Sequence, residues 1–280
     1  MEGNARDIHY ARGQWRPETG PMRIMVIGAH PDDPDFNCGS PAALWSRRGA
    51  RVVFVSLTNG DKGHHAMTPE ALAARREKEC EAAARVYGVE KYIILPNHDC
   101  ELEATLEARR EVTRLVRGFA PHVIFTHRTC DYHADHRAAG QLVMDATYLL
   151  GVPLWCPESP VPDARPAVFY MRDGFTRPWA QTPDLVVALD DELVALQIRA
   201  LACHASQVFE WLAHDKGIED IVPDPADEKA VAAYISKCWI EPRIGADARK
   251  YGLDCAHAAV FCVSEYGRTP TAEEMAFLRG

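Results

Sequence analysis

The feature of this sequence that most constrains its fold is a regular alternation in its first 150 residues. Short apolar runs alternate there with longer amphipathic segments. The apolar runs are residues 23–27, 52–57, 91–95 and 122–126. Short, continuously apolar strands separated by helices are typical of a parallel sheet that is covered on both faces. We therefore expect an α/β fold, a Rossmann-like three-layer α/β/α sandwich with a mostly parallel sheet.

The segments between these strands carry helical patterns. We expect helices at residues 42–48, 71–87, 102–119 and 135–150. The second of them has a clear start, because Thr68 is a capping residue and Pro69 suits the first helical position. It ends at Gly88, a residue that commonly terminates helices.

The pattern changes after Gly151. Seven of the nineteen prolines fall in residues 151–184, which predicts mostly loop with a short strand at 168–171. Further strands are expected at 185–189 and 257–263, and helices at 190–212 and 231–238. We predict an N-terminal arm over residues 1–21 and a single α/β domain over residues 22–280, with an elaborated C-terminal portion.

Composition narrows the class of protein. The formal net charge of −9 disfavours binding to nucleic acid or to an anionic membrane face. The N-terminal stretch lacks the apolar region of a signal peptide, and no apolar run approaches the ~18 residues that span a bilayer. Nine cysteines without a C-x-x-C pair predict reduced thiols rather than a disulfide framework. We expect a soluble, cytoplasmic protein.

Two clusters of histidine and aspartate follow the first and the fourth predicted strands. The first cluster contains His30, Asp32 and Asp33, and the second contains His133 and His136. The carboxyl ends of strands in an open parallel sheet lie at one edge, where ligands bind. The two clusters are about a hundred residues apart in the sequence, yet this topology brings them to the same edge.

Two histidines and one carboxylate suit a catalytic zinc ion, which takes three protein ligands and leaves one position for water. His30 and Asp33 can face one point, and His136 can meet them from the opposite side. Asp32 would then remain free to accept a proton from the attacking water. Another divalent metal is an alternative to zinc.

Two neighbouring residues receive supporting roles. His133 lies one helical turn before His136, where it could stabilise an oxyanion or protonate a leaving amine. Asp135 could orient a ligand histidine. An acidic residue in the first turn also stabilises a helix through its dipole, so the role of Asp135 stays open between the two.

These motifs identify a resemblance. A-H-P-D-D after the first strand and D-Y-H-A-D-H-R-A-A-G near the middle resemble the LmbE/PIG-L N-deacetylases. The resemblance covers roughly residues 22–212 and implies that His30, Asp33 and His136 bind zinc. It also implies that Asp32 is the general base and that His133 faces the oxyanion.

Weaker matches add two substrate-binding candidates. Arg76 fits the family's R-x-x-E helix, whose arginine lies near the substrate, although a solvated helix face is the alternative. Asp99 resembles an acidic residue that binds a sugar hydroxyl. Cys100 departs from the family pattern, in which glycine usually follows this acid. We expect His127 to be buried and hydrogen-bonded rather than a ligand, and His204 to be structural.

The expected reaction is hydrolysis of an N-acyl amide, with an N-acetyl amino sugar or a sugar conjugate as substrate. One alternative is an LmbE-like zinc hydratase that acts on an unsaturated dicarboxylate. Others are a catalytically inactive binding relative and a nucleotide-binding module, although the sequence lacks G-x-G-x-x-G. The resemblance also implies a homo-oligomer, often a trimer or a hexamer.

Overall fold

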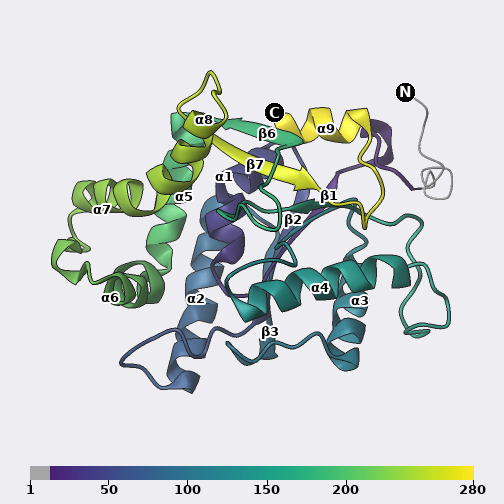
Figure 1. Cartoon of the computed structure of the whole chain (residues 1–280), viewed down its shortest axis with the longest axis horizontal. Coiled ribbons are helices and arrows are strands. Elements are labelled where there is room, and N and C mark those ends of the chain that lie inside the picture. The colour runs from purple at the N-terminus through teal and green to yellow at the C-terminus, as the bar shows by residue number, and fades with distance from the viewer. Residues whose placement is uncertain (1–12) are drawn as a thin grey trace.

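The computed structural model describes residues 13–280 and is built around a seven-stranded sheet in the order β3-β2-β1-β4-β5-β7-β6 (Figure 1). The strands are β1 (Arg23–Gly28), β2 (Arg51–Thr58), β3 (Lys91–Asn97), β4 (Val123–Thr126), β5 (Ala167–Tyr170), β6 (Leu185–Leu189) and β7 (His257–Val263). Only β7 runs antiparallel to its neighbours in this sheet. The prediction of a mostly parallel α/β fold is confirmed, and the late strands join the same sheet as the early ones.

Helices cover both faces of the sheet. The longer ones are α1 (Asp33–Arg47), α2 (Pro69–Tyr87), α3 (Leu106–Phe119), α4 (Ala134–Leu149), α5 (Asp191–Cys203), α7 (Glu228–Ile235) and α9 (Ala272–Arg279). Two short helices, α6 (Leu212–Lys216) and α8 (Ala246–Lys250), each follow a π-helical turn. These turns are η3 (Ser206–Trp211) and η5 (Ser236–Gly245).

The alternation of β1 side chains explains the three layers. Ile24 and Val26 belong to the hydrophobic core shared with α1, α2 and α5. Met25 and Ile27 belong to a second core, shared with α3 and α4 on the opposite face. Because successive strand residues point to opposite faces, a continuously apolar strand requires helices on both.

Three expectations about helices need correction. The helix expected at 42–48 begins at Asp33, because Pro34 and Pro41 hide its periodicity in the sequence. The helix expected at 190–212 is interrupted after Cys203. There the buried ring of His204 lies 3.1 Å from the carboxylate of Asp35 on α1, a long-range contact that local propensity does not reveal. The C-terminal helix α9 was not expected at all.

Residues 1–12 of the expected N-terminal arm lie outside the described residues. In the described part of the arm, Trp15 is buried and its ring packs edge-on against Phe277 of α9, with centroids 5.1 Å apart. No helix within residues 13–280 is long and apolar enough to cross a membrane.

The proline-rich loop after α4 is organised by Arg117 of α3, a buried guanidinium. It donates hydrogen bonds to the backbone carbonyls of Leu149, Leu150, Val152, Trp155, Cys156 and Ser159. The side chain thus satisfies the free carbonyls at the end of α4 and fixes the path of the loop beyond it.

We predict that Arg117→Met lowers the free energy of unfolding by about 2–4 kcal/mol, because it leaves several buried carbonyls without a donor. Urea unfolding followed by circular dichroism measures the change. Arg114→Met on the same helix is the matched control, since Arg114 is half-exposed and its ion pairs contribute about 0–1 kcal/mol. Equal effects of the two substitutions would contradict this account of the loop.

Candidate metal site and its pocket

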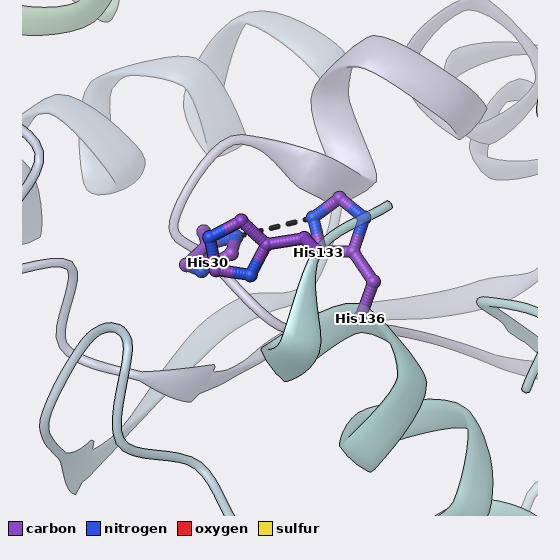
Figure 2. A group of neighbouring side chains, drawn as sticks. All are labelled: His30, His133 and His136. Atoms are coloured by element: carbon purple, nitrogen blue, oxygen red, sulfur yellow. Dashed lines mark hydrogen bonds between the residues drawn. The ribbon is translucent and has the colours of Figure 1, made fainter. Parts of the chain in front are cut away.

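The candidate site lies beyond the adjacent carboxyl ends of β1 and β4. The order of strands reverses at this point, which is where open α/β sheets bind ligands. His30 follows β1, and Asp33 is the first residue of α1. His133 caps the N-terminus of α4, and His136 lies in its first turn. Figure 2 shows the rings of His30, His133 and His136 gathered in this corner.

Donor atoms of three residues converge at this point. His30 Nδ1 lies 3.2 Å from His136 Nε2 (dashed in Figure 2) and 3.4 Å from Asp33 Oδ2. His136 Nε2 lies 3.4 Å from Asp33 Oδ1. Tetrahedral zinc with bonds of about 2.0–2.2 Å requires donor atoms roughly 3.3–3.6 Å apart. The residues present therefore fit a zinc ion.

Further side chains hold each of these donors. Asp33 Oδ2 accepts hydrogen bonds from the backbone N–H groups of Ala29 (3.0 Å) and His30 (2.7 Å) and lies 3.1 Å from His127 Nε2. His127 is buried, and its ring stacks on His136. The other oxygen, Asp33 Oδ1, is the one directed at His136.

Each ligand histidine has a carboxylate behind it. His30 Nε2 lies 3.2 Å from Asp135 Oδ2 and 3.2 Å from Asp99 Oδ1, while its Nδ1 faces the other donors. His136 Nδ1 lies 3.1 Å from Asp131 Oδ1. Carboxylates in this position fix the tautomer and orientation of a metal-binding imidazole. Asp135 is fully buried, so it is not simply a solvated acid at a helix start.

Charge around the donors favours a cation at this position. Burial by itself would lower the pKa of His30, but Asp135, Asp33 and Asp99 raise it well above its usual value. Burial likewise opposes protonation of His136, and Asp33 and Asp131 raise its pKa. A divalent ion can supply the positive charge that these carboxylates attract.

A glycine makes the approach of α1 possible. A Cβ atom on Gly28, the last residue of β1, would lie 2.5 Å from Asp33 Cβ and 2.9 Å from Pro34 Cδ. Any larger residue would displace the first turn of α1 and with it the Asp33 carboxylate.

Asp32 lies beside the donor atoms of His30, Asp33 and His136, and it is paired with a buried arginine. Arg76 Nη2 lies 3.1 Å from Asp32 Oδ2 and donates a hydrogen bond to the Pro31 carbonyl, while Nη1 donates to the Gly60 carbonyl. Burial raises the pKa of Asp32, and Arg76 opposes the shift. Arg76 is 2% exposed, which excludes a solvated helix face. It acts on the site by holding Asp32.

The ring of His133 faces that of His30 edge-on, with centroids 4.6 Å apart. Its Nδ1 accepts a hydrogen bond from the backbone N–H of Asp135 (3.1 Å), so the proton of the neutral ring is on Nε2. Burial, with His30 and His136 nearby, lowers the pKa of His133. A neutral ring with an Nε2–H donor suits contact with an oxyanion better than proton donation to an amine.

A pocket of about 680 Å³ opens in front of these groups. Its inner wall carries the donors, Asp32, Asp99 and His133. Its outer wall comes from late segments of the chain and includes Arg172, Phe175, Trp211, Lys216, Trp239 and Arg243. Cys100 also lines the pocket, in a left-handed backbone conformation (φ 64°) that glycine adopts more easily.

Sequence reasoning gave no role to two residues of the site, Asp131 and Arg243. Asp131 belongs to the D-Y-H-A-D-H motif, five residues before the histidine that it contacts, so a signal was present. Arg243 lies in a segment without a recognisable motif, and only the fold brings it to the pocket.

Fold and donor set together define an α/β protein with a candidate metal site at the switch point of its sheet. Residues 25–147 match the model of the PIG-L family, described as GlcNAc-PI de-N-acetylase. The chain thus resembles the LmbE/PIG-L family over this region, and the resemblance predicted from its motifs is confirmed.

Known proteins support this relationship. The diacetylchitobiose deacetylase of Thermococcus kodakarensis is 28% identical over 199 residues, which are 69% of this chain and 73% of that protein. The solved N,N'-diacetylchitobiose deacetylase of Pyrococcus horikoshii has 22% identity and a TM-score of 0.66, over 89% of this chain and 86% of that one. GalB, the 4-carboxy-2-hydroxymuconate hydratase of Pseudomonas putida, has 18% identity and a TM-score of 0.65, over 86% and 95%. Both solved structures have the same fold as this chain.

We predict that Asp131→Asn weakens zinc binding roughly 10–100-fold, because the amide holds His136 less firmly in the required tautomer. Competition with a chromophoric chelator measures the dissociation constant. Asp145→Asn on α4 is the matched control, since Asp145 pairs with Arg109 outside the pocket. Unchanged zinc affinity in Asp131→Asn would exclude this role for the carboxylate.

Proposed function

We propose that this protein is a zinc-dependent hydrolase that removes an N-acyl group from an amino sugar or a sugar conjugate. In this proposal the acyl group of the natural substrate is an acetyl group. The observation that carries the proposal is the convergence of donor atoms from His30, Asp33 and His136, with the carboxylate of Asp32 beside them. The deacetylase relatives support the same reaction. Two imidazoles and one carboxylate suit zinc better than magnesium or calcium, which prefer oxygen ligands.

Each side chain has a defined task in this reaction. Zinc held by His30, Asp33 and His136 would polarise the acyl carbonyl and acidify water. Asp32 accepts the proton of the attacking water, and Arg76 keeps its carboxylate oriented and ionised. The Nε2–H group of His133 donates a hydrogen bond to the oxyanion of the tetrahedral intermediate. Asp32 then returns this proton to the leaving nitrogen, and the products are a carboxylate and a free amine.

The pocket suits a sugar ring. Asp99 lines the inner wall, where its carboxylate could accept a hydrogen bond from a sugar hydroxyl. Arg76 and His30 hold the pKa of Asp99 well below its usual range, although burial opposes this, so the group is an acceptor only. Trp211 on the outer wall offers an apolar face on which a sugar ring can stack.

The cellular setting follows from the cysteines. All nine are free thiols, and Cys38, Cys80 and Cys156 are buried. Free thiols persist in reducing compartments, so we propose that the protein acts in the cytoplasm. We also propose a homo-oligomer, which light scattering coupled to size-exclusion chromatography would identify.

We predict that Asp32→Asn lowers kcat by about 10²–10⁴-fold, because the amide cannot accept a proton. Zinc content stays near one ion per chain, since Asp32 is not a ligand in this proposal. Acetate release and metal analysis of the same purified sample measure the two quantities. Loss of zinc together with activity would show that Asp32 binds the metal.

The decisive assay compares two reactions on the zinc-loaded protein. Acetate release is scored across N-acetylglucosaminides of varied aglycone, and the loss of ultraviolet absorbance is scored with a conjugated unsaturated diacid. We expect the first reaction and not the second. The reverse result would identify the protein as a hydratase, and the absence of both would favour a binding relative without activity.

A further inference from the structure

The outer wall of the pocket is built by the two π-helical turns of the described chain. Gln207 and Trp211 come from η3, and Trp239 and Arg243 come from η5. In a π-helix, residues four or five apart lie on one face, so Trp239 and Arg243 point into the pocket together. Single π-turns are rare and occur often at functional sites.

Arg243 differs from the other arginines that line the pocket. Arg76 is paired with Asp32, and Arg172 donates a hydrogen bond to Asp247 (2.8 Å). The guanidinium of Arg243 instead lies over the ring of Phe36, 4.8 Å from its centroid. Within residues 13–280 it makes neither an ion pair nor a side-chain hydrogen bond.

The surroundings of Arg243 make this arrangement costly. Burial lowers the pKa of Arg243, and the neighbouring Arg172 lowers it further, whereas Asp33, Tyr132 and Asp32 raise it. A desolvated cation beside a like charge is unfavourable unless an anion compensates it. The stack on Phe36 offsets a small part of this cost.

A second cation lies over the ring of Trp239. The ammonium group of Lys216 lies 5.5 Å from the centroid of that ring, and no carboxylate in the described chain pairs with it. Lys216 is exposed and lines the pocket, as does the preceding residue in the sequence, Asp215. Arg243 and Lys216 thus lie against two neighbouring rings, Phe36 and Trp239, and both line the pocket.

We propose that Arg243, supported by Lys216, is a subsite for an anionic group of the substrate, a carboxylate or a phosphate. This inference rests on the proposed deacetylase function and names its substrate class, acidic conjugates of N-acetylated amino sugars. The guanidinium matches both groups geometrically, because its donors form a planar fork.

The position of the subsite fits such a substrate. Phe36, on which Arg243 stacks, lies three residues after Asp33 on α1, and residues three apart are neighbours on a helix surface. Phe36 is thus about one helical turn, ~5 Å, from Asp33 along α1, and Arg243 lines the same pocket as the donors. An amino sugar can place its amide at the donors and a charged substituent at Arg243.

The test compares a neutral and an anionic substrate in wild type and in Arg243→Gln. Methyl N-acetylglucosaminide is the neutral probe and N-acetylglucosamine 1-phosphate the anionic one, with acetate release as the readout. We expect wild type to prefer the anionic probe through a lower KM. Arg243→Gln should lose roughly 10–100-fold in kcat/KM on the anionic probe and less than about threefold on the neutral one.

Lys237→Gln is the matched control, because Lys237 is exposed on the same π-turn and does not line the pocket. It removes the same charge and should leave the preference unchanged. Equal losses on both probes in Arg243→Gln would overturn the proposal, as would a wild type that does not prefer the anion. A loss in Lys237→Gln as large as that in Arg243→Gln would also overturn it.

Binding measurements test the anionic subsite independently of the proposed hydrolase function. If wild type hydrolyses neither probe, the deacetylase function fails, and calorimetric binding of glucosamine 1-phosphate decides the subsite alone. Tighter binding to wild type than to Arg243→Gln, with no such difference for methyl glucosaminide, would support it. Equal affinities would exclude it.

Discussion

The whole site depends on how the Asp33 carboxylate is held. The backbone leaving β1 donates two N–H groups to Asp33 Oδ2, and His127 from the end of β4 approaches the same oxygen. The second oxygen is therefore directed at His136. This arrangement requires α1 to begin immediately beyond the strand, which only a residue without a side chain at Gly28 permits. The path of the chain at the end of β1 therefore determines the position of the candidate metal donors.

The electrostatics of the site follow from this packing. Five carboxylates gather around the donors, and one of them is paired with the buried guanidinium of Arg76. They are Asp32, Asp33, Asp99, Asp131 and Asp135. Such an excess of negative charge raises the pKa of His30 well above its usual value despite burial. A divalent ion bound here would replace protons at these histidines, so its affinity would fall as pH decreases.

Much of the fold was predictable because short apolar strands and helix caps are local signals. The ends of the first and fourth strands placed His30, Asp33 and His136 together. The ends of helices were harder to predict, because Pro34 and Pro41 obscure α1. The π-turns have no sequence pattern, and the role of Asp131 depends on a ring orientation. Helix α9 did carry a signal, the Thr271–Glu274 capping box.

Reaction and recognition come from different parts of the chain. The family match ends at residue 147, so it includes every metal donor and Asp32 but neither π-turn. The family match over that region therefore informs the chemistry at the amide and the inner wall with Asp99, but not the outer wall. The outer wall has to be interpreted from its own contacts. Its one unpaired guanidinium, Arg243 over Phe36, is the contact there that distinguishes an anionic from a neutral substrate.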